Sequence, residues 1–163
     1  MDFLRFQLRI LAELSLETLY ALRRDFIAQK IAPILLPQAF RLIEWHRLQG
    51  HTLMIVTATY RFITEPIAAR FGVENLIATE PELIDRHYTG GVTGVPSFRE
   101  GKVIRLNAWL AERGLGLEHS WFYSDSHNDV PLLAKVKHPV AVDPDVNLAQ
   151  EARERAWPII SLR

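Results

Sequence analysis

The sequence predicts an α/β fold built on a mostly parallel sheet with helices on both faces. Two observations predict it. Short apolar runs of strand length recur after residue 50, and stretches with helical character separate them. Continuous apolar runs are typical of strands buried on both faces of a parallel sheet. Because parallel strands need crossover connections, the intervening helices are expected to cover both faces.

The first third of the chain is predicted to be helical. Apolar residues recur there at helical spacing with charged residues between them: Leu4, Leu8, Leu11, Leu14, Leu19, Leu22 and Phe26. Ser15 is placed to cap a second helix that starts at Leu16. Prolines then interrupt the pattern, and a further helix is predicted over 37–48, with Gly50 as its C-terminal cap.

The rest of the chain alternates between strands and helices. The predicted strands are 52–59, 75–79, 120–124 and 138–142, with 157–162 as a candidate fifth. The predicted helices are 64–72, about 99–116, and 129–136. Thr64 and Gly72 are expected to cap and stop the first of these helices. Gly90-Gly91, between β-prone residues, predicts the turn of a β-hairpin.

Composition narrows the class of protein. The chain has 163 residues, 48% of them apolar, which is enough for one domain with a proper core. Its formal net charge is zero, which argues against nucleic acid or an anionic membrane surface as the main partner. The absence of cysteine excludes disulfides and cysteine-bound metal. No signal-peptide block or membrane span is expected, so a cytoplasmic location is favoured; the oligomeric state stays unknown.

Polar side chains fall where predicted strands end and helices begin. Thr57 follows the apolar run "LMIV", Asp125 follows "WFYS", and Asp129 comes a turn later. Lys102 opens the helix after the hairpin. Because the carboxyl ends of parallel strands meet at one edge of a sheet, these groups are expected along one rim. Carboxylates can hold Mg²⁺, and a cation and a lysine can offset phosphoryl charge, so the set suits phosphoryl transfer.

Each of these residues also has a purely structural interpretation. Thr57 could be an ordinary β-branched strand residue, and Lys102 a solvated lysine. Asp129 could serve only as a helix N-cap. Asp125 is harder to explain in this way, because a carboxylate at a buried strand end is costly without a partner. His127, between the aspartates, is expected to be an exposed turn residue.

The order "IVTAT", "GKVIRL" and "YSDSHNDVPLL" resembles the second, third and fourth motifs of the haloacid dehalogenase-like phosphatases. The stretches "YTGGVTGVPSFREGK" and "HPVAVDPD" resemble the phosphoserine phosphatase-like subgroup in particular. The match covers roughly residues 37 to 160. It implies a Rossmann-like core over 37–163 and a partial helical cap over 1–36. It also implies a small phosphorylated metabolite as the substrate.

The resemblance implies a role for each matching residue. Thr57 would hydrogen-bond a phosphoryl oxygen, with the Ala58 amide nearby, and Asn128 would lie close to the phosphate. Lys102 would neutralise the phosphoryl group and the nucleophile. The Mg²⁺ residues are expected to be Asp125, as a direct ligand, and Asp129, which would bind through water or orient Lys102. Residues that could face the substrate, or have only surface or packing roles, are Tyr60, Arg61, Phe98 and Arg99.

The first motif of the family has no counterpart in the chain. That motif, Asp-x-Asp-x-Thr after the first strand, supplies the nucleophile and the general acid and base. Asp143 and Asp145 have the right spacing, but they follow the fourth predicted strand. The sequence therefore predicts that the first, central strand is missing and that the chain has little or no turnover.

Three interpretations remain open at this stage. The chain could be a truncated Mg²⁺-dependent phosphomonoester hydrolase, produced as a fragment or from a misplaced start. It could be a non-catalytic, degenerate phosphatase that serves as a phosphate-binding or interaction module. A separate peptide could also supply the missing strand. Loss of the central strand would leave two buried strand edges without hydrogen-bond partners. Because this costs much free energy, the first interpretation is favoured.

Overall fold

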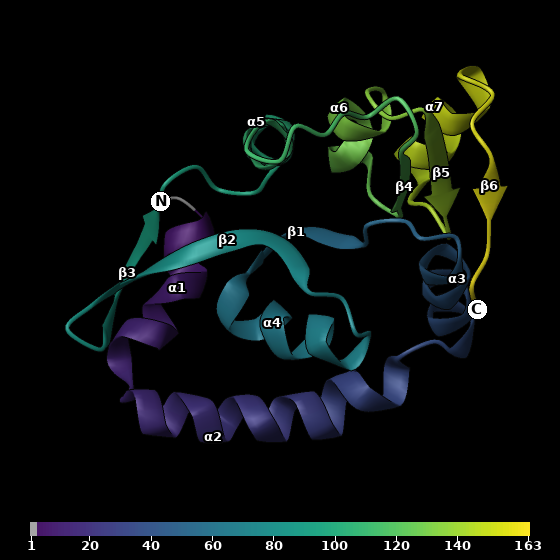
Figure 1. The fold of residues 1–163 in the computed structure, drawn as a ribbon. Helices are drawn as coiled ribbons and strands as arrows, with labels where there is room; N and C mark the ends of the chain where they lie inside the picture. Colours follow the sequence, from purple (N-terminus) through teal and green to yellow (C-terminus); the bar gives the residue numbers. More distant parts are fainter. Residues whose placement is uncertain (1–2) are drawn as a thin grey trace. The chain divides into compact units, whose positions relative to one another are not determined.

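A computed structural model describes the backbone of residues 3–163 and the side chains from Leu8 onward. Within this range the chain forms seven α-helices and six strands (Figure 1). It divides into two compact units, Met1–Ser97 and Phe98–Arg163. Each unit is described by itself. The predicted division into a cap over 1–36 and a core over 37–163 stays a prediction.

The first unit begins with three helices. Helix α1 spans Phe3–Glu13 and α2 spans Leu16–Phe26; a π turn and a 3-10 turn over 27–34 lead into α3, Pro37–Leu48. The Ser15 hydroxyl accepts a hydrogen bond from the Thr18 N–H at 3.3 Å, which confirms the predicted cap of α2. Gly50 has φ +74° after the end of α3, a conformation that glycine adopts without steric cost.

A three-stranded sheet completes this unit, in the order β1-β2-β3. Strand β1 (Met54–Tyr60) leads into α4 (Arg61–Arg70), and β2 (Asn75–Ile84) is followed by β3 (His87–Thr93). Strands β1 and β2 are parallel, whereas β2 and β3 are antiparallel. Thr64 is not the cap of α4, as predicted, but lies within it. Its hydroxyl donates to the Tyr60 carbonyl at 3.1 Å, because the chain turns from β1 directly into the helix.

The hairpin between β2 and β3 turns at a different place from the one predicted. Asp85 and Arg86 form the turn with φ +47° and +63°, which is the sign that a type I′ turn requires at both central positions. Gly90 and Gly91 lie inside β3. Gly90 has φ +82°, a conformation that residues with a Cβ rarely adopt, which explains a glycine at this position within the strand. The core of the unit is a cluster of Leu8, Leu11, Leu19, Phe62 and Tyr88.

The second unit holds a parallel sheet in the order β4-β5-β6. Its strands are β4 (Trp121–Ser124), β5 (His138–Val142) and β6 (Ile159–Ile160). Its helices are α5 (Glu100–Ala111), α6 (Val130–Leu133) and α7 (Val146–Glu154). The core cluster is Leu133, Ala141, Leu148 and Ala152, which joins both later helices to β5. Helix α7 is not predicted from the sequence; in this unit β4, β5, α5 and α6 match their predicted places, although α5 and α6 are shorter.

The prediction of a mixed α/β fold is confirmed, and the strand pairs are parallel except for the β2–β3 hairpin. The strands form two three-stranded sheets, each within one unit, and not one continuous sheet. Among the described residues no single helix is long and apolar enough to cross a membrane. Only the stretch 16–34 together with α3, which is bent by 89° relative to it, meets the length and composition requirement.

Candidate active site

The loop after β4 carries the predicted metal-binding residues. We call residues 125–129 the aspartate loop. Strand β4 ends at Ser124, and a short 3-10 turn over His127–Asp129 leads directly into α6. The Ser126 hydroxyl accepts hydrogen bonds from the Asn128 N–H and the Asn128 side-chain amide, both at 3.3 Å. This serine therefore caps the turn and fixes the direction in which the loop presents its side chains.

Lys102 and Asp129 form a buried ion pair at the centre of the site. The Lys102 Nζ donates to Asp129 Oδ1 at 2.5 Å, and each side chain is 8% exposed. The Ser124 hydroxyl donates to the other carboxylate oxygen, Oδ2, at 2.7 Å. Both oxygens of Asp129 are thus engaged. These contacts are those expected of a carboxylate that orients Lys102, one of the two roles that the resemblance implied.

Asp125 differs from Asp129 in its surroundings. Its side chain is exposed, while its backbone carbonyl accepts a hydrogen bond from the Asp145 N–H at 2.8 Å. Mg²⁺ in phosphoryl-transfer sites keeps several waters and uses one or two carboxylates together with substrate oxygens. The exposed carboxylate of Asp125 is accessible to such a cation, whereas both oxygens of Asp129 accept hydrogen bonds from Lys102 and Ser124. No cluster of three metal-ligating side chains occurs among the described residues.

Asp145 ties the aspartate loop to the start of α7. Its Oδ2 accepts from the His127 N–H and its Oδ1 from the Leu148 N–H, both at 2.8 Å. Desolvation by itself would raise the pKa of Asp145. The backbone N–H groups of His127, Leu148 and Asn147, with the nearby His127 side chain, outweigh it and lower the pKa. Asp145 is therefore a structural carboxylate.

Asp143 also has a structural role. It lies at φ +43° after β5, and its Oδ2 accepts from the Leu162 N–H at 3.1 Å. Hydrogen bonds from the Ser161 side chain and the Leu162 backbone lower its pKa. The Asp-x-Asp pair of residues 143 and 145 is thus occupied in holding the C-terminal loops. It does not stand in for the family's first motif.

The other two predicted phosphate-binding residues, Thr57 and Ala58, belong to the first unit. The pairing of β1 with β2 is regular up to Val56 and then shifts register. The Thr57 hydroxyl accepts from the Thr59 N–H at 3.2 Å, which stabilises a bulge and leaves the hydroxyl proton to donate to a ligand. The Ala58 carbonyl accepts from the Thr79 hydroxyl at 2.8 Å. Lys102 and Asp129 are paired in the second unit, where Asn128 lies in the same loop as Asp129, whereas Thr57 and Ala58 lie in the first unit.

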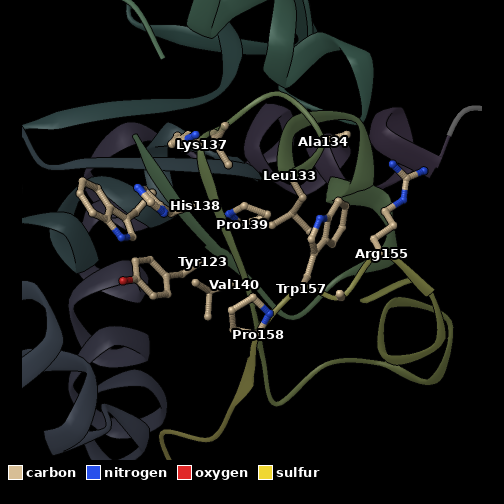
Figure 2. Close-up of a pocket in the computed structure, with 13 residues that line it drawn as sticks. Tyr123, Leu133, Ala134, Lys137, His138, Pro139, Val140, Arg155, Trp157 and Pro158 are labelled. Carbon is tan, nitrogen blue, oxygen red and sulfur yellow. The ribbon is translucent and has the colours of Figure 1, made fainter. Parts of the chain in front are cut away.

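A hollow of about 740 Å³ lies in the second unit but away from these residues (Figure 2). It is lined by the beginnings of β4 and β5 and by the segment before β6. The Trp121 ring stacks on the His138 ring at 4.4 Å between centroids. Because the aspartate loop follows the opposite, carboxyl end of β4, the hollow is separate from the candidate active site.

Two residues of the site were not predicted from the sequence. Ser124 was included only as the last residue of an apolar strand, although a hydroxyl five residues before Asp129 could have suggested a partner for that carboxylate. Asp145 was considered only as part of a misplaced Asp-x-Asp pair. The signal for its actual role was the pattern Asp-x-x-Leu before apolar residues at helical spacing, which is typical of an N-cap.

These features define the class of protein. Residues 1–134 match the family described as haloacid dehalogenase-like hydrolase, and the chain belongs to that family. A histidinol-phosphatase of Neisseria meningitidis is 43% identical over 165 residues, covering 99% of this chain and 74% of that protein. Phosphoserine phosphatase SerB1 of Mycobacterium tuberculosis is 33% identical over 149 residues. The chain spans about half of SerB1's length, 48%.

A solved structure matches closely as well. A crystal structure of a protein of unknown function from Bordetella pertussis Tohama I superposes with a TM-score of 0.95 at 47% identity. The match covers 98% of this chain and 73% of that protein. The fold described above is therefore shared with the Bordetella protein over the matched residues.

Removing the hydroxyl of Ser124 is expected to weaken the fold. Ser124→Ala leaves one oxygen of the buried Asp129 without its donor, so the free energy of unfolding should fall by about 1.5–3 kcal/mol. Ser97→Ala is the matched control, because the Ser97 hydroxyl is fully buried and has no hydrogen-bond partner among the described residues. Urea denaturation should show that Ser97→Ala leaves the free energy of unfolding unchanged or raises it. Equal losses in both variants would contradict the assignment.

The Asp145 cap should give a defined pH dependence. Asp145→Ala should lower the free energy of unfolding at pH 7 by about 1 kcal/mol, whereas Asp145→Asn should lose less because Asn also caps helices. A carboxylate with a lowered pKa stabilises the fold fully above its ordinary value of 3.8, and this contribution is lost as the pH falls through the lower folded value. In urea denaturation, the difference between wild type and Asp145→Asn should be constant above about pH 5 and shrink below pH 4. A difference in the free energy of unfolding that grows as the pH falls would contradict a stabilising Asp145 carboxylate with a lowered pKa.

Proposed function

We propose that the chain carries the phosphate-binding and Mg²⁺-binding half of a phosphomonoester phosphatase site. The observation that supports it most is the buried Lys102–Asp129 ion pair, held by Ser124, the residue before the exposed Asp125. An ordinary surface lysine would not be enclosed in this way, because burying an ion pair has a large desolvation cost. A fixed ammonium beside a carboxylate-bound cation is suited to a phosphoryl group.

In this proposal each residue has a separate task. Lys102 neutralises the phosphoryl oxygens, and Asp129 together with Ser124 holds its ammonium in place. Asp125 would hold Mg²⁺, which would supply further charge neutralisation at the phosphate when bound. In the first unit, the Thr57 hydroxyl accepts from the Thr59 N–H and keeps its proton for a phosphoryl oxygen, the role that the family resemblance implies. Asn128 lies in the aspartate loop, where its side-chain amide donates to the Ser126 hydroxyl.

The chain by itself is proposed to bind without turning over. The covalent route of the family needs an aspartate nucleophile from the Asp-x-Asp-x-Thr motif, and the 163 residues do not contain that motif. The pair Asp143 and Asp145 is committed to structural hydrogen bonds. Removing the nucleophile from a catalytic unit can cost several orders of magnitude in rate.

The favoured ligand is L-histidinol phosphate. The relative at 43% identity, which the chain covers over 74% of its length, is named a histidinol-phosphatase. The phosphoserine phosphatase SerB1 is less similar, at 33%, and is covered over a smaller share of its length. Isothermal titration in Mg²⁺ should therefore give a lower dissociation constant for L-histidinol phosphate than for phospho-L-serine. The reverse order would favour the phosphoserine assignment, and binding of neither would refute the site.

A second candidate is a non-catalytic module that binds phosphate or a partner protein. The missing first motif favours it. It predicts a stable, cooperatively unfolding chain with saturable phosphate binding. Near-UV circular dichroism separates it from a mere fragment of a phosphatase, which should lack fixed aromatic signals although it retains helical far-UV signals.

A further inference from the structure

Arg99 has an unusual backbone conformation at the start of α5. It occupies the N-cap position with φ +48° and ψ −120°, and its side chain makes no capping hydrogen bond to the helix. This region of φ and ψ is populated almost only by glycine, because a Cβ clashes with the neighbouring backbone. A non-glycine residue in such a region typically costs about 1–3 kcal/mol. A glycine would start the helix here without strain, so the local backbone does not explain why the residue is an arginine.

The side chain of Arg99 reaches the aspartate loop. Its Nε donates to Asn128 Oδ1 at 3.1 Å, so it connects the start of α5, which carries Lys102, to the loop that carries Asp129. The guanidinium carbon lies 5.1 Å from the centroid of the Phe98 ring. Arg99 forms no ion pair with a carboxylate of the residues whose side chains are described, and the residue is exposed. Most of its N–H donors therefore remain for a ligand.

Arg61, unlike Arg99, has its guanidinium paired with a carboxylate. Its Nε donates to both carboxylate oxygens of Glu80, at 2.9 and 3.0 Å, and its Nη2 donates to the Leu76 carbonyl at 2.8 Å. These contacts give Arg61 a packing role between α4 and β2. Of the two arginines that could have faced a substrate, only Arg99 has a guanidinium without a carboxylate partner.

The charges of the candidate site in the second unit favour a second cationic side chain in addition to Lys102. Lys102 is already neutralised by Asp129, and Asp125 adds a negative charge. A phosphomonoester carries close to two negative charges at neutral pH. With Mg²⁺ bound at Asp125 as proposed, these residues and the cation sum to one positive charge, so without Arg99 one of the ligand's two negative charges would lack a partner. An arginine fork matches two phosphate oxygens in geometry as well as in charge.

We propose that Arg99 binds the phosphoryl group of the substrate as a second cationic donor beside Lys102, and that its strained backbone is kept for this contact. The inference rests on the proposed function of the same site. It names the ligand class as a dianionic phosphomonoester. The Nε of Arg99 would keep its hydrogen bond to Asn128, while its two terminal amino groups would face the phosphoryl oxygens.

The test compares Arg99→Gly with wild type in two measurements. Glycine removes the guanidinium and relieves the backbone strain, so the melting temperature should rise by about 2–8 °C. The affinity for inorganic phosphate with Mg²⁺, measured by isothermal titration, should fall by about 10- to 100-fold. Arg99→Lys keeps the charge but not the fork, and its affinity should lie between the two. A purely structural Arg99 would predict a lower melting temperature together with unchanged affinity.

Arg86→Gly is the matched control. Arg86 also has a positive φ, +63°, and is exposed, but it lies in the hairpin turn between β2 and β3. Its replacement should relieve strain and leave phosphate affinity unchanged. If Lys102→Met abolishes phosphate binding and Arg99→Gly leaves it within twofold, the inference about Arg99 is wrong and the proposed site stands. If wild type binds no phosphate, both are wrong.

Discussion

Replacing Lys102 by methionine is expected to produce the largest loss of stability of any single change at the site. The substitution keeps most of the apolar stem but leaves Asp129, 8% exposed, without its cation. Breaking a buried ion pair from one side typically costs about 3–5 kcal/mol. Urea denaturation followed by circular dichroism should show that loss, and isothermal titration should show no phosphate binding in the variant.

The double variant Lys102→Met, Asp129→Asn separates the two effects. Asparagine removes the uncompensated charge and can still accept a hydrogen bond from Ser124. Stability should therefore recover in large part, whereas phosphate binding should stay absent because no ammonium is present. Recovery of phosphate binding in the folded double variant would contradict the role given to Lys102.

Asp125→Asn should produce the opposite pattern, a functional loss without a loss of stability. The Asp125 side chain is exposed, and its structural contribution is the backbone carbonyl that accepts from the Asp145 N–H. Substitutions at exposed positions usually change stability by no more than about 0.5 kcal/mol. Wild type should bind phosphate more tightly when Mg²⁺ is added, and in the variant this enhancement should fall by at least about tenfold.

Asp25→Asn is the control for Asp125→Asn. Asp25 is an exposed aspartate on α2, in the first unit. Its replacement by asparagine changes the net charge by the same amount as Asp125→Asn. Its replacement should leave the Mg²⁺ enhancement as in wild type. A similar loss of enhancement in both variants would mean that net charge, and not a ligand at Asp125, produces the effect.

Much of the fold could be predicted because the local signals agree with it. Ser15 caps α2, Gly50 follows α3, and the run 138–142 forms β5 with the predicted bounds. The failures occurred where a strong local signal competed with tertiary packing. Gly90-Gly91 suggested a turn, but Gly90 adopts φ +82° within β3, and the turn formed at Asp85 and Arg86.

The site could be predicted in its residue types but not in its connections. The spacing of Asp125 and Asp129 indicated a cation site, yet it could not show that one carboxylate is exposed while the other is buried against Lys102. That difference depends on hydrogen bonds from Ser124 and from Lys102 at the start of α5. Lys102 lies 27 residues before Asp129 in the sequence. Side-chain partners at such separations leave no periodic signal in a single sequence.

The most direct test of the central proposal measures binding and turnover on the same purified 163-residue chain. Isothermal titration should show saturable phosphate binding that strengthens with Mg²⁺, and a phosphate-release assay with L-histidinol phosphate should show no hydrolysis above the uncatalysed rate. Mg²⁺-dependent hydrolysis that is abolished by Asp125→Ala would contradict the account, because the chain would then perform the chemistry without the aspartate nucleophile that its family uses.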